Sequence, residues 1–186
     1  VQCWGNNLVG ELGSGNMNNS SSAVTVPGIT TAIQVSAGQE HTCALLSSGS
    51  IKCWGSGGSG QLGDGTWLNR LAPATVSGIS TATQISSGGF HTCARLSDST
   101  VKCWGYNWYG QLGNNTQTDQ AAPVAVSGIT TATQVAAEGY TNSCAVLASG
   151  TVKCWGDNSY GQLGDGTYTQ RLTPVSVASI TTATQV

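Results

Sequence analysis

The chain has 186 residues, enough for one sizeable domain, and only 8% of them are charged, with a formal net charge of −2. This near-neutral balance lacks the basic stripe of a DNA- or RNA-binding surface and the polybasic cluster of a membrane-surface contact. No apolar run approaches the ~20 residues that span a bilayer. Hydrophobic residues make up 39% and recur at fixed places, which argues against disorder. We therefore expect a folded protein with no nucleic-acid partner and no membrane insertion.

A repeat of about 50 residues is the main signal in the sequence, and repeats of this length are typical of solenoids and propellers. Its clearest marker is a tryptophan within Cys-Trp-Gly, which occurs at Trp4, Trp54, Trp104 and Trp155. Because these tryptophans recur in every unit, we expect them to pack the units together. The repeat predicts one domain over 1–186, with units at approximately 1–35 (partial), 36–85, 86–135 and 136–186.

Each unit passes through the same elements in the same order. Cys-Trp-Gly is followed by a Gly-Gln-Leu-Gly type turn, then by a strand rich in proline and valine, and then by an Ile-Thr-Thr-Ala type segment. A Cys-Ala strand comes last and occurs three times, whereas the other elements occur four times. The turns lie at 10–13, 60–63, 110–113 and 161–164, the Ile-Thr-Thr-Ala type segments at 29–32, 79–82, 129–132 and 180–183, and the Cys-Ala strands at 43–44, 93–94 and 144–145.

The elements of one unit are short and strand-like. Residues 41–47 and 51–55 are β-rich runs joined by three residues that include a glycine, which predicts a hairpin. Residues 152–155 alternate as a half-buried strand does. No stretch of ten or more residues combines a helical period with caps. Several short strands in each unit of about 40–50 residues favour propeller blades over an open β-solenoid, whose repeats are usually shorter.

The sequence resembles a known repeat family. Trp-Gly-Asp-Asn-Ser-Tyr-Gly-Gln-Leu-Gly at 155–164 and His-Thr-Cys-Ala-Leu at 41–45 are similar to the signature of regulator of chromosome condensation 1 (RCC1) repeats, and the resemblance covers essentially the whole chain. It implies an all-β protein with about four blades of four-stranded antiparallel sheet, part of a larger propeller or assembly of about seven blades. Family members include a guanine-nucleotide exchange factor for a small GTPase, bacterial inhibitor proteins and secreted bacterial proteins. The chain looks like the secreted bacterial type, although a shared fold does not transfer function.

Two features depart from the exchange factor of that family. None of its functional loops has a match here, and this chain carries less charge. Within the repeat, Asn142 stands where the other copies have His41 and His91.

The cysteines alternate at spacings of about 40 and 10 residues. Three pairs flank the three predicted hairpins, where neighbouring strands bring Cα atoms within disulfide distance. Metal binding fits poorly because no CxxC motif or closely spaced histidine accompanies them. We therefore expect disulfides and an oxidising, extracellular or cell-surface location, with Cys3 left unpaired or bonded between molecules. The expected pairs are Cys43 with Cys53, Cys93 with Cys103, and Cys144 with Cys154.

Both ends of the sequence fall inside the repeat. The chain begins within a Cys-Trp-Gly motif and ends at Thr184-Gln185-Val186, where the next Cys-bearing strand is due. We expect a mature product or a fragment, a segment of a larger propeller whose missing part comes from further chain or from another copy, because open strand edges are otherwise exposed.

The polar residues give no catalytic, metal or cofactor site. His41 and His91 occupy equivalent positions, which favours a structural hydrogen bond over catalysis. Asp64-Gly65 and Asp165-Gly166 lack the spacing of a calcium loop and read as turns. The Gly-Gln-Leu-Gly turn lacks the lysine and the following helix of a phosphate loop. Weak glycosylation patterns begin at Asn18, Asn19 and Asn114.

The aromatic residues that differ between units are the candidate binding residues. Exposed aromatics on a rigid scaffold often contact partners or sugars, although local turn packing is the alternative. The candidates are Trp67, Tyr106, Trp108, Tyr109, Tyr160 and Tyr168.

These observations predict a non-enzymatic propeller that acts as an interaction or structural module, with a protein or further copies of itself as partner. Two alternatives stay open. One is a module that binds carbohydrate or a target enzyme through its loop aromatics. The other is a nucleotide-exchange regulator of a small GTPase, which the resemblance alone suggests.

Overall fold

The computed structural model describes residues 1–137 and 139–186, and over these residues the regular structure consists of fourteen β-strands without a helix. Accordingly, the described residues contain no helix with the length and apolarity to cross a bilayer. The strands are β1 (Gln2–Gly5), β2 (Ser20–Thr25), β3 (Ala32–Ala37), β4 (His41–Leu46), β5 (Ile51–Gly55), β6 (Arg70–Thr75), β7 (Ala82–Ser87), β8 (His91–Leu96), β9 (Val101–Gly105), β10 (Gln120–Ala125), β11 (Ala132–Ala136), β12 (Asn142–Leu147), β13 (Val152–Gly156) and β14 (Arg171–Ser176).

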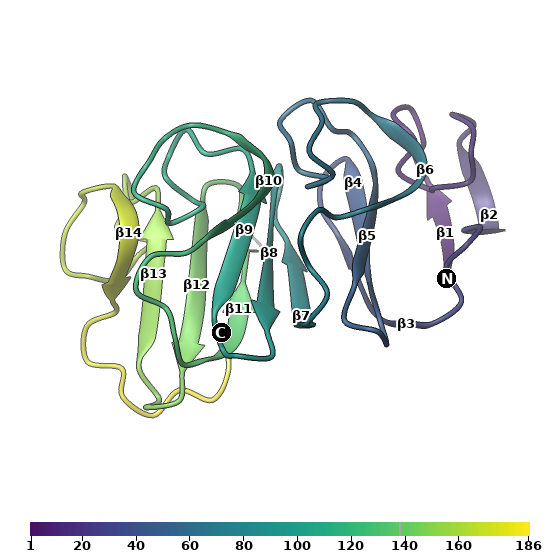
Figure 1. The fold of residues 1–186 in the computed structure, drawn as a ribbon. Coiled ribbons are helices and arrows are strands. Elements are labelled where there is room, and N and C mark those ends of the chain that lie inside the picture. The colour runs from purple at the N-terminus through teal and green to yellow at the C-terminus, as the bar shows by residue number, and fades with distance from the viewer. Residues whose placement is uncertain (138) are drawn as a thin grey trace.

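The strands form antiparallel sheets in which each strand pairs with its neighbour in the chain. We call these sheets blade 1 (β1 and β2), blade 2 (β3 to β6), blade 3 (β7 to β10) and blade 4 (β11 to β14). Within the described ranges, blades 2, 3 and 4 are complete four-stranded meanders and blade 1 has two strands (Figure 1). Strands β1 and β2 correspond to the third and fourth strands of a complete blade, because Cys3 pairs with Val24 as Cys53 pairs with Ala74.

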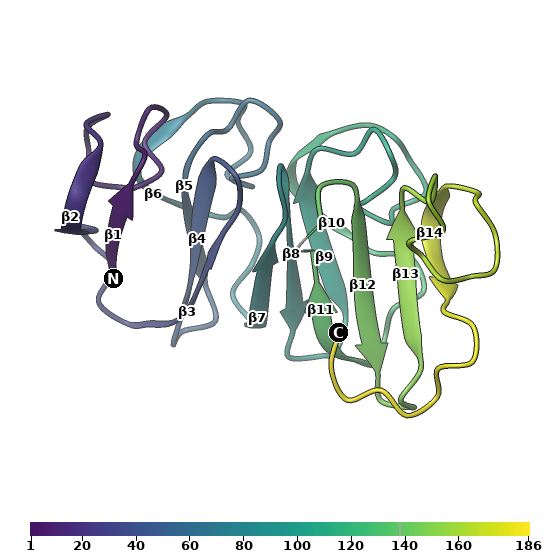
Figure 2. The same ribbon diagram turned by 180° about the vertical axis from the view of Figure 1, so that it is seen from behind.

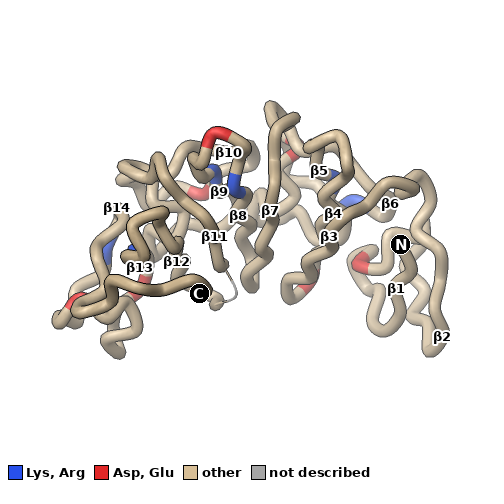
Figure 3. The backbone as a smooth tube through the Cα atoms, turned by 90° about the horizontal axis from the view of Figure 1, so that it is seen from below, with Lys and Arg blue, Asp and Glu red and all other residues tan. Residues whose placement is uncertain are grey.

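The blades stand side by side in chain order, with blade 1 at one end of the row and blade 4 at the other (Figures 1 and 2). The first strands of neighbouring complete blades lie in contact, β3 with β7 and β7 with β11. Successive sheets therefore turn about an axis on the side of their first strands, and the view from below shows the resulting arc (Figure 3). This is the expected propeller architecture, and the described chain forms part of such a ring.

The predicted hairpins and disulfides are confirmed. Each second strand pairs with the third, with its cysteine directly opposite the partner cysteine. The disulfides in the described part of the chain join Cys43 to Cys53, Cys93 to Cys103 and Cys144 to Cys154, each with a Cα–Cα distance of 4.1 Å.

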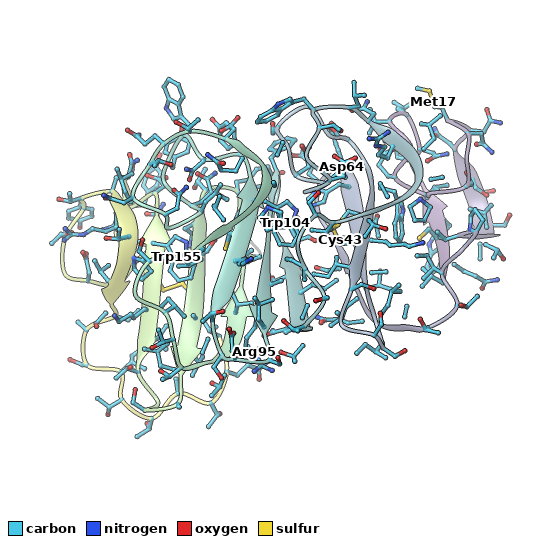
Figure 4. The ribbon with its side chains drawn as sticks, in the orientation of Figure 1. Met17, Cys43, Asp64, Arg95, Trp104 and Trp155 are labelled. Atoms are coloured by element: carbon cyan, nitrogen blue, oxygen red, sulfur yellow. A yellow bond between two sulfur atoms is a disulfide. The ribbon has the colours of Figure 1, made fainter. Side chains whose placement is uncertain are left out.

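The hydrophobic core lies between the blades rather than within any one of them. Trp104 and Trp155 are fully buried between neighbouring sheets (Figure 4). Each ring rests on a glycine of the preceding blade. At Gly63, for example, φ is +68° and an added Cβ would lie 2.6 Å from Nε1 of Trp104. Trp4 differs from the expectation that every repeat tryptophan packs a junction. Its side chain is 67% exposed, because the described residues place no blade before blade 1.

Each junction between blades also contains a buried carbonyl oxygen that accepts hydrogen bonds from the next blade. It belongs to the residue before the leucine of the Gly-Gln-Leu-Gly type turn. The Gln61 carbonyl accepts hydrogen bonds from Trp104 Nε1 (2.9 Å) and from Thr92 Oγ1 (3.2 Å). The carbonyls of Glu11 and Gln111 accept the corresponding bonds at the other two junctions. Such bonds fix the distance and the rotation between blades, so the blades form a rigid support for their loops.

Candidate functional site

One end of the blades carries the long loops and most of the exposed aromatic rings. In an antiparallel meander, the turn between the first and second strands and the loop between the third and fourth strands emerge at the same end. The chain confirms this, because Ser56 N donates to Glu40 O (2.8 Å) and Tyr106 N donates to Phe90 O (2.9 Å). We call this the loop end. Figure 4 shows Met17 at the loop end and Arg95 at the opposite end.

A buried asparagine holds the loop between the third and fourth strands in blades 1, 3 and 4. In blade 3, Asn107 Nδ2 donates to the carbonyl oxygens of Thr116 (3.0 Å) and Thr118 (3.1 Å), and its Oδ1 accepts from Leu112 N (3.0 Å). Asn7 and Asn158 make the equivalent bonds. The backbones of these loops are therefore preorganised.

In blade 2 an ion pair holds the loop, because glycine replaces the asparagine at position 57. Asp64 accepts from Thr66 N (2.9 Å) and Oγ1 (2.8 Å) and pairs with Arg70 Nε at 2.7 Å. Burial opposes ionisation of Asp64, but the bonds from Thr66 and Arg70 outweigh it and lower its pKa. The predicted Asp-Gly turns thus also anchor an arginine. Asp165 repeats the arrangement in blade 4, where the Thr167 hydroxyl lowers its pKa to about 2.

The predicted binding aromatics all lie in these loops, but they form two groups. The first lies over blades 2 and 3, where Trp67 and Trp108 are 51% and 65% exposed. Tyr106 and Tyr109 are half-buried beside Trp108 and meet edge to face, with ring centroids 6.4 Å apart. These four residues are the central group.

The second group is Tyr160 and Tyr168, which lie on the outer side of blade 4 and are 89% and 77% exposed. They border a shallow hollow with Gly161. At the internal junctions, the equivalent glycine lies against the fourth strand of the next blade, as Gly10 lies against Leu71. Tyr160 and Tyr168 are therefore exposed because blade 4 lies at the end of the row. They are not part of the central group.

Sequence reasoning missed two aromatic residues at the loop end. Phe90 and Tyr140 lie in the turns between the first and second strands of blades 3 and 4, one repeat position apart, and meet edge to face, with centroids 6.3 Å apart. Tyr140 is 58% exposed, and Gln111 Nε2 donates to its carbonyl oxygen at 3.4 Å. Both lie in the short turn before the Cys-bearing strand, and comparison of this turn between the repeats would have identified them. With the central group they form what we call the loop-end aromatic surface.

The two histidines lie away from this surface, buried between blades. His41 Nε2 lies 2.8 Å from the hydroxyl of Thr92, and His91 Nε2 lies 2.9 Å from that of Ser143. Because each hydroxyl already donates to a carbonyl, it accepts from the histidine, so Nε2 carries the proton and Nδ1 carries the lone pair. Burial lowers the pKa of His41 to about 4 and that of His91 to about 3. Both rings are neutral at pH 7 and link neighbouring blades.

The charged residues that the structure describes separate between the two ends of the blades. The loop end has more acidic than basic residues, namely Glu11, Glu40, Asp64, Asp119, Asp157 and Asp165 with Arg70 and Arg171. The opposite end has more basic than acidic residues, namely Lys52, Arg95, Lys102 and Lys153 with Asp98. Over the described ranges, no three His, Cys, Asp or Glu side chains come together as metal ligands. The loop-end surface therefore offers a partner aromatic rings, neutral polar groups and carboxylates.

Comparison with solved structures identifies proteins of similar fold. Human WBSCR16 matches with a TM-score of 0.82 and 25% identity over 93% of this chain and 46% of that one. Yeast RCC1 (Prp20) bound to Kap60 matches with a TM-score of 0.80 and 18% identity over 95% of this chain and 44% of that one. Prp20p from Saccharomyces cerevisiae, described with its binding to Gsp1p and histones, matches with a TM-score of 0.77 and 20% identity over 95% and 45%. The chain thus spans less than half the length of each of these structures.

A search of curated proteins found no significant sequence match. Two family models, both described as the regulator of chromosome condensation (RCC1) repeat, do match. One covers residues 1–45, 48–95, 99–146 and 149–186. The other covers 32–61, 82–111 and 132–162, and each of these matches begins at the first strand of a complete blade. The chain therefore belongs to the RCC1 repeat family.

Proposed function

We propose that this chain is a non-enzymatic, extracellular or cell-surface interaction module that binds a protein partner through its loop-end aromatic surface. The observation that supports the proposal is the set of exposed rings on loops fixed by buried asparagine and aspartate side chains. Tryptophan and tyrosine dominate the binding energy of protein interfaces, and loops whose backbones are already fixed lose less entropy on binding.

Two further features support a protein partner outside the cell. The loop end combines exposed rings with more carboxylates than basic side chains, and Arg70 and Arg171 each pair with an aspartate there, so its net negative charge favours a partner surface of complementary charge. The disulfides are stable in an oxidising compartment and are rare in the reducing cytosol.

Carbohydrate is the second candidate ligand, because exposed Trp67 and Trp108 offer flat faces on which sugar rings can stack. The low charge of the chain suits a neutral glycan as well as a protein surface. The two candidates make different demands. A glycan needs one or two of the rings, whereas a protein interface of ordinary size covers rings of more than one blade.

The test compares the wild-type chain with a Trp67→Ala/Trp108→Ala variant. Both are used as bait for proteins of the extracellular fraction of the source culture and are applied to a glycan array. Loss of a hot-spot ring costs about 2 kcal/mol or more, so we expect the retained partner to bind the variant at least ~30-fold more weakly. The control is Ile33→Ala, which removes a 65% exposed apolar side chain from the opposite end of blade 2.

Each outcome decides between functions. A protein partner lost in the tryptophan variant and kept in the control supports the proposal. Glycan binding lost in the same variant, without a protein partner, replaces it with the carbohydrate function. Equal retention of the partner by both variants contradicts a loop-end site. Accelerated nucleotide release from a small GTPase would replace the proposal with the exchange function that the family resemblance suggests.

A further inference from the structure

The loop between β9 and β10 of blade 3 carries a negative charge that its own residues do not neutralise. Asp119 is the single charged residue in this loop. The corresponding loops of blades 2 and 4 each pair an aspartate with an arginine, as Asp64 pairs with Arg70. Blade 3 has Asn114 and Gln120 at these two positions, so no such pair forms there.

The fold of the loop does not require the charge of Asp119. Its Oδ1 accepts a hydrogen bond from Asn107 N at 2.7 Å. In blade 2, Asn69 Oδ1 accepts the same bond from Gly57 N at 3.0 Å, so a neutral amide oxygen is sufficient. Burial raises the pKa of Asp119, although the bond from Asn107 N opposes this effect. The ionised carboxylate therefore costs free energy that an amide would not.

The second carboxylate oxygen of Asp119 is available to a ligand. Among the described residues, Oδ2 accepts no hydrogen bond and lies in no ion pair. The unpartnered side-chain atoms that are fully buried in this part of the chain are Nδ1 of His41, Nδ1 of His91 and Nε of Arg95. Since Oδ2 of Asp119 is not one of them, it is reachable from solvent.

Two tyrosine rings lie beside this carboxylate. Tyr106 and Tyr109 meet edge to face, with ring centroids 6.4 Å apart and an angle of 65° between the ring planes. Tyr106 directly precedes Asn107, whose amide donates to Asp119. Burial is the main cause of a raised pKa of Tyr106, and the nearby Tyr109 and Asp119 add to it. The carboxylate and the two rings thus form one cluster.

The rings, like the charge, are particular to blade 3 and are not needed for the turn. Blade 2 has Ser56 and Ser59 at the positions of the two tyrosines. Ser59 N nevertheless donates to the glutamine of its turn at 2.9 Å, as Tyr109 N does at 3.1 Å. The same backbone forms without the rings, so the cluster is free to serve a ligand.

A carboxylate beside aromatic rings favours an organic cation. The ring faces attract a cation through their negative electrostatic potential. The carboxylate oxygen adds an opposite charge and accepts a short hydrogen bond. Guanidinium suits this combination better than ammonium, because it is planar and weakly hydrated and can stack on a ring while its edge donates to the carboxylate.

We propose that Asp119, Tyr106 and Tyr109 form a binding site for the guanidinium group of an arginine side chain on the protein partner. This inference rests on the proposed function, because it names the chemistry by which the loop end recognises that partner. Trp108, in the same loop and 65% exposed, provides apolar contact for the residues that flank the arginine.

The site is tested first with a small probe, N-acetylarginine amide, added to the isotope-labelled full chain. The reporter is the NMR resonance of the Asn107 amide, which donates to Asp119. We expect this resonance to shift and saturate. Asp119→Asn keeps the acceptor oxygen, as Asn69 does in blade 2, and removes the charge. This variant should bind the probe at least about fivefold more weakly.

Three comparisons separate a built site from general charge attraction. Tyr106→Ser/Tyr109→Ser, which gives blade 3 the residues of blade 2, should also bind at least about fivefold more weakly. Asp157→Asn removes a loop-end carboxylate of blade 4 and should bind as the wild type does. N-acetyllysine amide should bind the wild type more weakly than the arginine probe. An unmoved Asn107 resonance, or the opposite result in any of the three comparisons, would overturn the proposal.

The partner retained by the wild-type chain supplies the second readout. We expect Asp119→Asn to bind it at least about fivefold more weakly, and substitution of an arginine in the partner to have the same effect. A partner that is lost with Trp67→Ala/Trp108→Ala but binds Asp119→Asn as tightly as the wild type would leave the proposed function standing and refute the arginine site. Probe binding without any retained partner would do the reverse.

Discussion

The buried histidines tie neighbouring blades together through a chain of donors and acceptors. His41 donates to Thr92, which donates to the Gln61 carbonyl, and Trp104 donates to that same oxygen. Protonation of the ring would place a charge on Nδ1, a buried atom with no hydrogen-bond partner among the described residues. The junction therefore requires the neutral ring.

We expect the free energy of unfolding to fall as pH drops below about 6.5, the ordinary histidine pKa. The folded pKa values are about 4 for His41 and about 3 for His91, so the unfolded chain binds more protons throughout this window. The contribution of the neutral histidines to the free energy of unfolding is fully present above pH 6.5 and is lost as pH falls towards 4. The loss is on the order of 3 kcal/mol for each histidine. Urea unfolding at pH 7 and pH 4.5 measures it.

A matched control comes from blade 4, where Asn142 replaces the histidine. A His41→Asn/His91→Asn variant should show a flatter dependence on pH between 6.5 and 4. An unchanged slope would mean that other groups dominate. The aspartates with lowered pKa, such as Asp165, lose their contribution only at lower pH.

At the scale of the elements, the tryptophan of each third strand and the turn glycine of the preceding blade set how closely two sheets approach. Gly63 combines a left-handed backbone with a Cβ position that meets the ring of Trp104. The repeat keeps this pair, with Gly113 against Trp155 at the next junction. The glycine therefore has two roles, the turn and the packing, and they can be separated by mutation.

We expect Gly63→Ala to destabilise the protein by about 2–4 kcal/mol, because about 1 kcal/mol of backbone strain adds to a ring displacement costing about 1–3 kcal/mol. Gly78→Ala is the matched control. Its φ is +65°, close to the +68° of Gly63, but nothing lies within 4 Å of the added Cβ. The control should lose about 1 kcal/mol. Equal losses in urea unfolding would show that packing against Trp104 contributes nothing.

At the scale of the whole molecule, the blades differ in how much of each face is covered. Among the described residues, blade 3 lies between two complete blades, blades 2 and 4 each have one complete neighbour, and blade 1 has two strands. The C-terminal residues partly cover the outer face of blade 4. Val186 N donates to Gln134 Oε1 at 2.8 Å, as Val135 N does to Gln84 Oε1 one blade earlier.

We expect amide hydrogen exchange to follow this order, with blade 3 slowest, blades 2 and 4 intermediate and blade 1 fastest. Local opening is easiest where few apolar groups are buried and backbone groups face solvent. Mass-spectrometric exchange with peptides assigned to each blade measures the order. Fastest exchange in blade 3 would contradict packing between blades as the source of stability.

Part of the loop-end surface followed from the sequence and part did not. The variable aromatics could be assigned to loops because they fall between Cys-Trp-Gly and the following strand. That Trp67 and Trp108 share one end with Phe90 and Tyr140 depends on the antiparallel order within each sheet and on the contact between sheets. The exposed position of Trp4, in a repeat whose other copies are buried, depends on the blades beside it.

The sequence alone determined the strands, the hairpins and the disulfides, because these depend on residues about ten positions apart whose pairing a short turn enforces. The family also followed from the repeat. Only the tertiary structure decided which repeat positions are buried and which are open, because burial depends on whether a neighbouring blade is present. Val35 and Ile85 are equivalent in the repeat, yet Val35 is 45% exposed, whereas Ile85, whose backbone is hydrogen-bonded by Gln34, is 1% exposed.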